Sequence, residues 1–360
     1  MPKRSPLFET QRDAGADFVE FRGREVPNRF TSLEEEYDAL EHKAGLLDLS
    51  VQSVAELRGK DRSRFLHGMV TNDIQSLSLG QGCYALMLTP QGRILTDMRV
   101  LCLENVLFLV IDADLVEKDL TLLRKYIIGD QVEVIDRSAD LAIISLQGPK
   151  AGDTIVGLCS SETSLPKVPF DHKLIQVGNV PARCIHMRRT ASEGYDLIVS
   201  EAHSVDLWNL LLRSGKSASL LPVGLEAWNV RRLEAGIAWY GSDMDEARIP
   251  LETGLEEAIS YSKGCYLGQE VVARATYRGQ VNRKLMGLLL SSGQPAQKED
   301  KILHNGHEVG WVTGSAYSPR LQRAIALAYI RKEAWNPGTT VRVERGNVQT
   351  DAEVTQYPFD

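Results

Sequence analysis

The stretch Tyr84–Asp112, YALMLTPQGRILTDMRVLCLENVLFLVID, decides the central part of the fold. Turn-forming residues interrupt it twice, at Pro90-Gln91-Gly92 and at Glu104-Asn105. The intervals between these turns are rich in apolar residues, so we expect strands over residues 84–89, 93–103 and 106–112. Strands joined by such short turns pair in antiparallel order. The stretch therefore predicts a three-stranded meander.

The sequence on either side extends this meander into an α+β unit. We expect a strand over residues 54–58, a helix over 113–127 and a further strand over 131–135. Strands and helices alternating over residues 53–137 indicate a mostly antiparallel sheet with helices packed on it. Upstream, Ser32 and Glu35 form a capping-box pattern that starts a helix. Gly45 is expected to end that helix, before a strand over residues 46–50.

The character of the sequence changes from about Lys284 onward. Short apolar segments alternate with turns, and Asn305-Gly306 is a hairpin signal. We expect strands over residues 285–290, 301–304, 308–313, 324–330, 340–344 and 353–356. This pattern indicates an all-β terminal domain, a barrel or a sandwich, whose boundary lies near residues 275–284.

The composition limits the possible functions. The chain has 360 residues and a formal net charge of -7, which gives it no general attraction for nucleic acids or anionic membranes. No apolar run approaches the roughly 20 residues that span a bilayer, and no secretory signal is recognised. The five cysteines are scattered without a CxxC pair, which argues against disulfides and a cysteine-based metal site. We therefore expect a cytoplasmic protein without a bound metal.

Two acidic residues are candidates for chemistry. The strand period places Asp97 on an apolar face, where desolvation would raise the pKa of its carboxyl group towards a value suited to proton transfer. The alternatives are that this face points to solvent, or that Asp97 forms a simple ion pair with Arg93 or Arg99. Asp196 begins a strand after a turn and could accept two parallel hydrogen bonds from an N–C–N edge. The alternative for Asp196 is an exposed acid at a strand edge.

The segment Lys263–Glu270, KGCYLGQE, is the most unusual in the chain. Cys265 precedes a helix that we expect from Gln269 to Ala275, and it is close in sequence to Lys263. A positive field from both sources would lower the pKa of the thiol and favour the reactive thiolate. A buried structural thiol is the alternative.

Several segments, in the right order along the chain, resemble the glycine-cleavage T-protein superfamily. They are Gly45–Ser50, Val70–Ile74, Gly92–Asp97, Leu146–Pro149, Arg232–Gly236 and Tyr240–Glu246. The resemblance implies an α+β fold of three domains in a cloverleaf around a central folate cavity. These domains would be a discontinuous folate-binding domain (residues 1–52 with 138–275), a ferredoxin-like α+β domain (53–137) and a C-terminal β-barrel (280–360).

The same resemblance implies roles for four residues. Asp97 falls on the catalytic aspartate, which lies near the N5/N10 edge of the folate. Tyr84 resembles a tyrosine that packs near the pterin, and Asp196 falls on the pterin-binding glutamate. Arg232 belongs to the family's R-L-E-A-G segment and is expected to help bind the cofactor. That cofactor would be tetrahydrofolate or a related reduced folate.

The K-G-C-Y-x-G-Q-E segment is similar to the signature of the YgfZ-type branch, which supports iron–sulfur enzymes. The residues that carry it are Lys263, Gly264, Cys265, Tyr266, Gly268, Gln269 and Glu270. Our main hypothesis is therefore a YgfZ-type folate-binding protein that acts on iron–sulfur clients with Cys265 as an essential thiol. The first alternative is an aminomethyltransferase that uses a lipoylated carrier protein and Asp97. The second alternative is a non-catalytic scaffold, which would bind no folate.

Overall fold

The computed structural model describes residues 2–160, 162–215, 219–279 and 281–359. None of the helices in these ranges is long and apolar enough to cross a membrane. The chain forms two compact units, each assembled from segments that are distant in sequence. The first unit comprises residues 1–87, 96–228 and 258–266, and the second comprises residues 88–95, 229–257 and 267–360.

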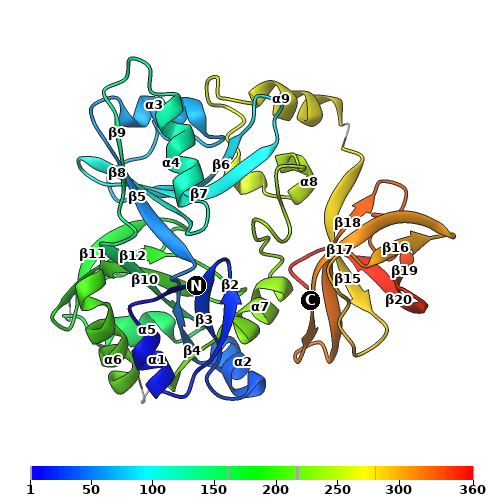
Figure 1. Cartoon of the computed structure of the whole chain (residues 1–360), viewed down its shortest axis with the longest axis horizontal. Coiled ribbons are helices and arrows are strands. Elements are labelled where there is room, and N and C mark those ends of the chain that lie inside the picture. Colours follow the sequence, from blue (N-terminus) through cyan, green and yellow to red (C-terminus); the bar gives the residue numbers. More distant parts are fainter. Residues whose placement is uncertain (1, 161, 216–218, 280, 360) are drawn as a thin grey trace. The chain divides into compact units, whose positions relative to one another are not determined.

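Three sheets form the framework of the first unit (Figure 1). The smallest sheet, in the order β1-β3-β2, contains β1 (Lys3–Arg4), β3 (Arg24–Arg29) and β2 (Asp17–Phe21). The second sheet, in the order β11-β12-β13-β10-β4-β14, contains β11 (His172–Val177), β12 (Val180–His186), β13 (Gly194–Ser200), β10 (Leu141–Gln147), β4 (Ala44–Asp48) and β14 (Leu220–Pro222). The third sheet, in the order β6-β7-β8-β5-β9, contains β6 (Gly82–Leu88), β7 (Ile94–Cys102), β8 (Val106–Asp112), β5 (Gln52–Arg58) and β9 (Glu133–Asp136).

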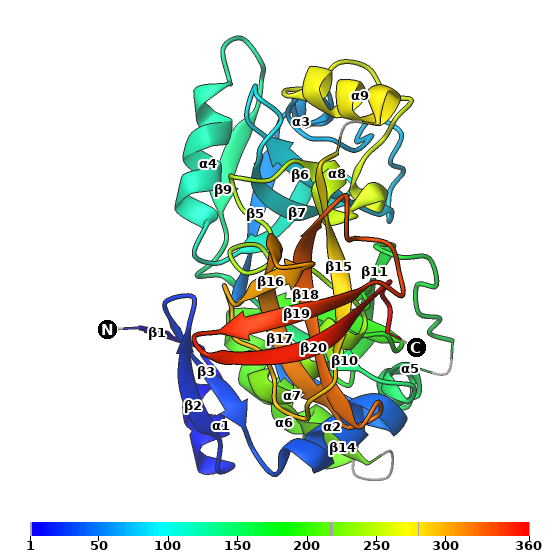
Figure 2. The ribbon, with the colours of Figure 1, turned by 90° about the vertical axis from the view of Figure 1, so that its right-hand side faces the viewer.

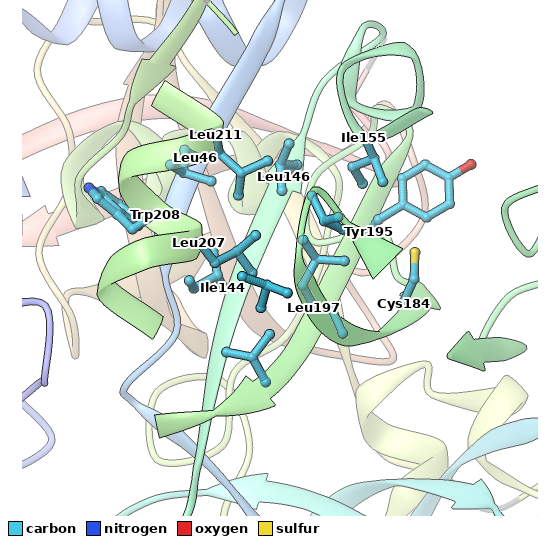
Figure 3. Packing of buried hydrophobic residues seen from close by; sticks show 14 of the residues in the cluster. Leu46, Ile144, Leu146, Ile155, Cys184, Tyr195, Leu197, Leu207, Trp208 and Leu211 are labelled. Carbon is cyan, nitrogen blue, oxygen red and sulfur yellow. The ribbon is translucent and has the colours of Figure 1, made fainter. Parts of the chain in front are cut away.

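The helices of this unit cover the sheets. They are α1 (Phe8–Asp13), α2 (Leu33–His42), α3 (Arg62–Met69), α4 (Val116–Lys125), α5 (Ala151–Val156), the 3₁₀ turn η1 (Glu201–His203) and α6 (Ser204–Ser214). Figure 3 shows a hydrophobic core of this unit, in which Leu207 and Leu211 of α6 lie beside Ile144 and Leu146 of β10. Because side chains alternate along a strand, this packing leaves the opposite face of β10 and β13 for other residues.

The predicted meander is confirmed as β6, β7 and β8, and the strand expected over 106–112 has those bounds as β8. The predicted capping of α2 is also confirmed, because the Ser32 hydroxyl accepts a hydrogen bond from the Glu35 amide at 3.2 Å. The expected helix over 113–127 is shorter and runs over α4. The small sheet β1-β3-β2 and the strands β11 and β12 were not predicted.

Gly45 corrects one expectation. Helix α2 ends at His42, and Gly45 lies inside β4 instead of ending the helix. A Cβ atom at Gly45 would lie 2.6 Å from the Leu40 side chain and 2.7 Å from the Val223 side chain. Only glycine allows α2 and the segment after β14 to approach the strand this closely, so packing explains the residue.

The second unit is dominated by a closed six-stranded barrel in the order β15-β18-β17-β16-β19-β20 (Figure 2). Its strands are β15 (Arg283–Leu290), β16 (Lys301–His304), β17 (His307–Ser318), β18 (Arg323–Arg331), β19 (Thr340–Arg345) and β20 (Val348–Thr355). Asn305 and Gly306 both have positive φ at the β16–β17 turn, as the hairpin signal predicts. The unit also holds α8 (Pro250–Thr253) and α9 (Gln269–Arg278), while the residues of α7 (Leu225–Glu234) and of the 3₁₀ turn η2 (Glu256–Ala258) are divided between the two units. The predicted mixed α+β class with a C-terminal β-barrel is confirmed.

Candidate functional site

The carboxylate of Asp97, on β7, lies in the interior of the first unit with 4% of its surface exposed. Its Oδ2 atom accepts hydrogen bonds from the Tyr84 hydroxyl and from Nη1 of Arg99, both at 2.9 Å. Its Oδ1 atom accepts none from the residues that the structure describes. Burial raises the pKa of Asp97, while the charge of Arg99 and the Tyr84 hydrogen bond oppose that rise. The result is a buried acid with one acceptor atom left for a ligand.

The Tyr84 ring is covered by protein groups, and its hydroxyl donates to Asp97. Its ring is 4% exposed, with the Arg99 guanidinium 4.7 Å from its centroid and the ring of Phe170 stacked at 6.3 Å. A π-face covered by a cation is a favourable contact that also orients the ring. The structure therefore places Tyr84 beside Asp97, as a donor to its carboxylate.

Gln52 links Asp112 with the second sheet. In the β5–β8 ladder Gln52 lies opposite Asp112, and its Nε2 atom donates to Asp112 Oδ1 at 3.3 Å. Arg22 forms an ion pair with the other oxygen of Asp112. Gln52 Oε1 in turn accepts a hydrogen bond from Nη2 of Arg189 at 2.6 Å. The charge of Asp112 also raises the pKa of Asp97, so these groups form one electrostatic cluster.

Asp196 has a partner within the protein. It lies on β13 between Tyr195 and Leu197 of the hydrophobic core, so strand alternation places it on the opposite face, where it is 1% exposed. Nε of Arg189 donates to Asp196 Oδ1 at 3.0 Å and to Oδ2 at 3.1 Å, and Nη2 also contacts Oδ2. The Arg189 backbone is fixed as well, by Gln147 Oε1 and by Nε1 of Trp228. The expected N–C–N edge at Asp196 is thus present and belongs to Arg189.

Arg232 lies in the second unit and is also fully engaged. Its guanidinium donates to Asn229 Oδ1 at 2.9 Å and to the Ile237 carbonyl at 3.1 Å, and it pairs with Asp243. It also lies 4.2 Å from the centroid of the Trp239 ring. With 3% of its surface exposed, Arg232 holds the turn after α7 together. Its folate-binding role stays a prediction.

Lys263 of the KGCYLGQE segment is a buried ammonium held by backbone oxygens. Its Nζ atom donates to the carbonyls of Val70 at 2.7 Å and Asn72 at 2.8 Å, and to that of His67. Burial lowers its pKa to about 8. The Asn72 side chain then donates to the Tyr84 carbonyl at 2.8 Å. All three N–H bonds of Lys263 are therefore committed to the segment that leads towards Tyr84.

The other residues of this segment divide between packing and exposure. Tyr266 is buried below Lys263, whose ammonium lies 5.0 Å from the ring centroid. Gly268 has φ +82° and would place a Cβ atom 2.5 Å from the Thr89 carbonyl oxygen. Cys265 is exposed. Gly264 lies in the loop before α9, and Gln269 and Glu270 form the first turn of α9, where the helix expected over 269–275 is confirmed.

Asp119, on α4, is a buried acid that the sequence analysis did not single out. It is 0% exposed, and neither carboxylate oxygen has a hydrogen-bond partner among the described residues. Burial raises its pKa to about 7, partly opposed by the neighbouring Thr96 hydroxyl. Thr96 itself donates to the Asp97 carbonyl at 3.3 Å. Asp119 thus lies behind the strand that carries Asp97.

Sequence reasoning also missed Gln52 and the Arg189–Asp196 pair. The only local signal was that Asp97 and Arg99 lie two residues apart on one strand, which suggested their ion pair as an alternative. Gln52 and Arg189 are 137 residues apart, so no local pattern joins them. In the described part of the chain, no group of three His, Cys, Asp or Glu side chains is arranged to hold a metal ion.

Comparison with known proteins gives a consistent result. The family model of the GCVT N-terminal domain matches residues 7–263, and that of the glycine cleavage T-protein C-terminal barrel domain matches residues 283–360. An aminomethyltransferase of Bacillus licheniformis is 33% identical, covering 100% of this chain and 99% of the relative. One of Bacillus subtilis is 31% identical with the same coverage. The crystal structure of glycine cleavage system aminomethyltransferase T from Bartonella henselae is 25% identical and superposes with a TM-score of 0.91, over 100% of this chain and 98% of that chain.

These findings correct the main functional hypothesis. The prediction of a YgfZ-type protein serving iron–sulfur clients is wrong, because the relatives matched along the whole chain are aminomethyltransferases. The eight-residue segment that suggested it has a structural explanation. Lys263 and Tyr266 are buried in packing, and Gly268 is required by positive φ and a close backbone approach.

The full-length match to both family domains and the shared fold lead to one conclusion. The chain belongs to the glycine-cleavage T-protein family.

Proposed function

We propose that this protein is an aminomethyltransferase that transfers a one-carbon unit from an aminomethyl-lipoyl carrier protein to tetrahydrofolate. The products would be methylene-tetrahydrofolate, ammonia and the free dihydrolipoyl carrier. The names of the full-length relatives support this activity. Within the chain, the observation that carries it is the buried Asp97 carboxylate with one unused acceptor atom.

The balance of the reaction requires proton transfer. The carbon–sulfur bond to the carrier and the carbon–nitrogen bond to the departing amine both break, while two bonds form from the carbon to folate nitrogens. The folate nitrogens release two protons, one of which is bound by the carrier thiol and one by the departing ammonia. A group that accepts and returns a proton near neutral pH therefore assists the transfer.

Asp97 has the properties that this role needs. Its burial raises its pKa, so that its carboxylate binds a proton more readily than an exposed aspartate does. Its Oδ1 atom is an acceptor for a folate N–H group, while Tyr84 and Arg99 fix the position of Oδ2. These donors and acceptors fit a reduced folate. We restrict the proposal to Asp97 with Tyr84 in support, because Asp196 and Arg232 are already engaged by protein groups.

The test is turnover by the purified full-length protein with aminomethyl-loaded lipoyl carrier and tetrahydrofolate. A known T-protein provides the positive control, and methylene-tetrahydrofolate and ammonia are both measured. We expect turnover, with a loss of roughly 10²–10⁴-fold in Asp97→Asn. Asp206→Asn, which neutralises an exposed carboxylate on α6, is the matched control and should retain full activity.

Two results would count against the proposal in different ways. Absence of turnover while the known T-protein is active would refute the transferase function. Turnover that is equal in Asp97→Asn and the wild type would leave the function standing and refute the role of Asp97.

A further inference from the structure

The second unit contains a cavity of about 780 Å³ that the proposed reaction does not use. Its lining residues come from the 89–94 turn, from α8 and α9, and from the adjoining ends of β15 and β18. The volume lies within the range of sites for small organic ligands, roughly 300–1,000 Å³. It is far larger than a single inorganic ion requires.

The wall formed by the 89–94 turn is held by close contacts with neighbouring segments of the same unit. Gly92 has φ +72°, and a Cβ atom there would lie 2.6 Å from the Val271 side chain of α9. The Ile94 amide donates to the Arg248 carbonyl at 3.0 Å, and Nη1 of Arg93 donates to the Ala247 carbonyl at 2.7 Å. These contacts, one of them between backbone groups, all lie within the second unit.

The lining is cationic, although the whole chain is acidic. It includes four cations, Arg93, Arg283, Arg331 and Lys332, and two acids, Glu252 and Glu333.

The charge of Glu252 is already balanced. Its Oε1 atom accepts from Nε of Arg283 at 2.9 Å, and its Oε2 atom accepts from the Ile249 amide. The side chains of Arg331 and Lys332 have no ion pair or hydrogen bond among the described residues. The remaining lining cations, Arg93, Arg331 and Lys332, outnumber the one remaining lining acid, Glu333, so the cavity keeps a net positive charge.

A second observation concerns the strand pairing at the cavity wall. Arg283 of β15 and Arg331 of β18 are directly opposite each other in the antiparallel ladder. Like charges at such positions repel and destabilise a sheet, because the side chains are about 5 Å apart at Cβ. The pair brings two guanidinium groups to one side of the cavity, which suits an anion that contacts both.

We propose that this cavity binds a small organic polyanion, one that carries two or more carboxylate or phosphate groups. Arg331 and Lys332 supply the free cations, and the Arg283–Arg331 pair supplies adjacent guanidinium groups that bind an oxyanion by paired hydrogen bonds. All residues that line the cavity belong to the second unit, whereas Asp97 belongs to the first. Its test is therefore independent of the transferase activity.

The experiment is isothermal titration of the full-length protein with citrate and, separately, with pyrophosphate at low ionic strength. Both probes are multiply charged, and comparing them distinguishes carboxylate from phosphate chemistry. The variants are Arg331→Gln, Lys332→Gln and the double variant. Arg342→Gln removes an exposed arginine elsewhere on the barrel, where it pairs with Asp351, and is the matched control.

We expect one binding site for at least one probe, with affinity reduced about tenfold by each single variant and unchanged in Arg342→Gln. Thermal unfolding without ligand provides a second measurement. Because Arg331→Gln relieves the cross-strand repulsion, its Tm should equal or exceed that of the wild type. Binding of neither probe, binding that is unaffected by the two variants, or a lowered Tm in Arg331→Gln would overturn the proposal.

Discussion

Replacing Asp119 by asparagine tests the energetic cost of a buried acid without a partner. Asp119 is fully buried on α4, and neither oxygen accepts a hydrogen bond from a described residue. Burial raises its pKa from 3.8 to about 7. Asparagine has nearly the same shape and carries no charge at any pH. The substitution therefore removes the ionisation and leaves the packing nearly unchanged.

The sign and size of the effect follow from the two pKa values. The folded protein holds a proton on Asp119 that the unfolded chain releases between about pH 4 and pH 7, so the free energy of unfolding falls as the pH rises through that range. The difference in pKa corresponds to about 4 kcal/mol once the pH exceeds 7. At pH 5 less than half of this loss has occurred. Asp119→Asn should therefore gain about 3 kcal/mol over the wild type between pH 5 and pH 8.5.

The assay is urea unfolding followed by tryptophan fluorescence at several pH values between 5 and 8.5. Trp208 is buried in the same unit and reports on it. Burying the asparagine amide costs the same free energy at every pH. Comparing how the stability of the variant and of the wild type changes with pH therefore removes this constant contribution. Glu117→Gln removes an exposed acid from the same helix but keeps Asp119, so its stability should differ from that of the wild type by an amount that does not change with pH. A difference between Asp119→Asn and wild type that stays constant with pH would refute the reasoning.

Three further predictions concern the first unit. Tyr84→Phe removes a hydrogen bond that lowers the pKa of Asp97, so the acid limb of the pH–rate profile should move to higher pH; an unmoved limb would contradict this. Asp196→Asn leaves the buried Arg189 without its charge partner, so it should lower the free energy of unfolding by about 3–5 kcal/mol, measured by urea titration. A loss below about 1 kcal/mol would show that the ion pair is not needed for stability. Lys263→Met leaves three carbonyls without their donor and should lower the free energy of unfolding by about 3 kcal/mol or more, while Lys263→Arg should recover part of this loss. Wild-type stability in Lys263→Met would exclude a stabilising role for the Lys263 ammonium.

Local chemistry accounts for the parts of the fold that the sequence predicted. The Ser32 cap, the turns of the meander and the Asn305-Gly306 hairpin each depend on a few adjacent residues, and each is present in the structure. Gly45 was misinterpreted because its role is to let α2 and the segment after β14 approach β4. Such a contact between segments distant in sequence leaves no periodic pattern.

In the candidate site, too, the features set by neighbouring residues could be predicted, and the contacts between distant segments could not. Asp97 was recognised from strand alternation and resemblance, and its pairing with Arg99 was foreseen as an alternative because the two residues share a strand face. The partner of Asp196 could not be predicted, since Arg189 reaches it from the preceding loop and is itself held by Gln52 from another sheet. Likewise the packing of Lys263 could not be predicted, because its carbonyl partners lie more than 190 positions earlier in the chain, whereas the chemistry expected of Cys265 stays a prediction.

The contacts of Lys263 also have a consequence for biosynthesis. Its ammonium binds carbonyls of residues that precede it by more than 190 positions, and the segment 258–266 completes a unit that begins near the N-terminus. A ribosome produces chain at roughly 5–20 residues per second, so the early segment would wait about ten seconds or more for its lysine. During that interval the carbonyls of Val70 and Asn72 would remain exposed to solvent or to chaperones. The first unit can therefore close only after most of the chain has been translated.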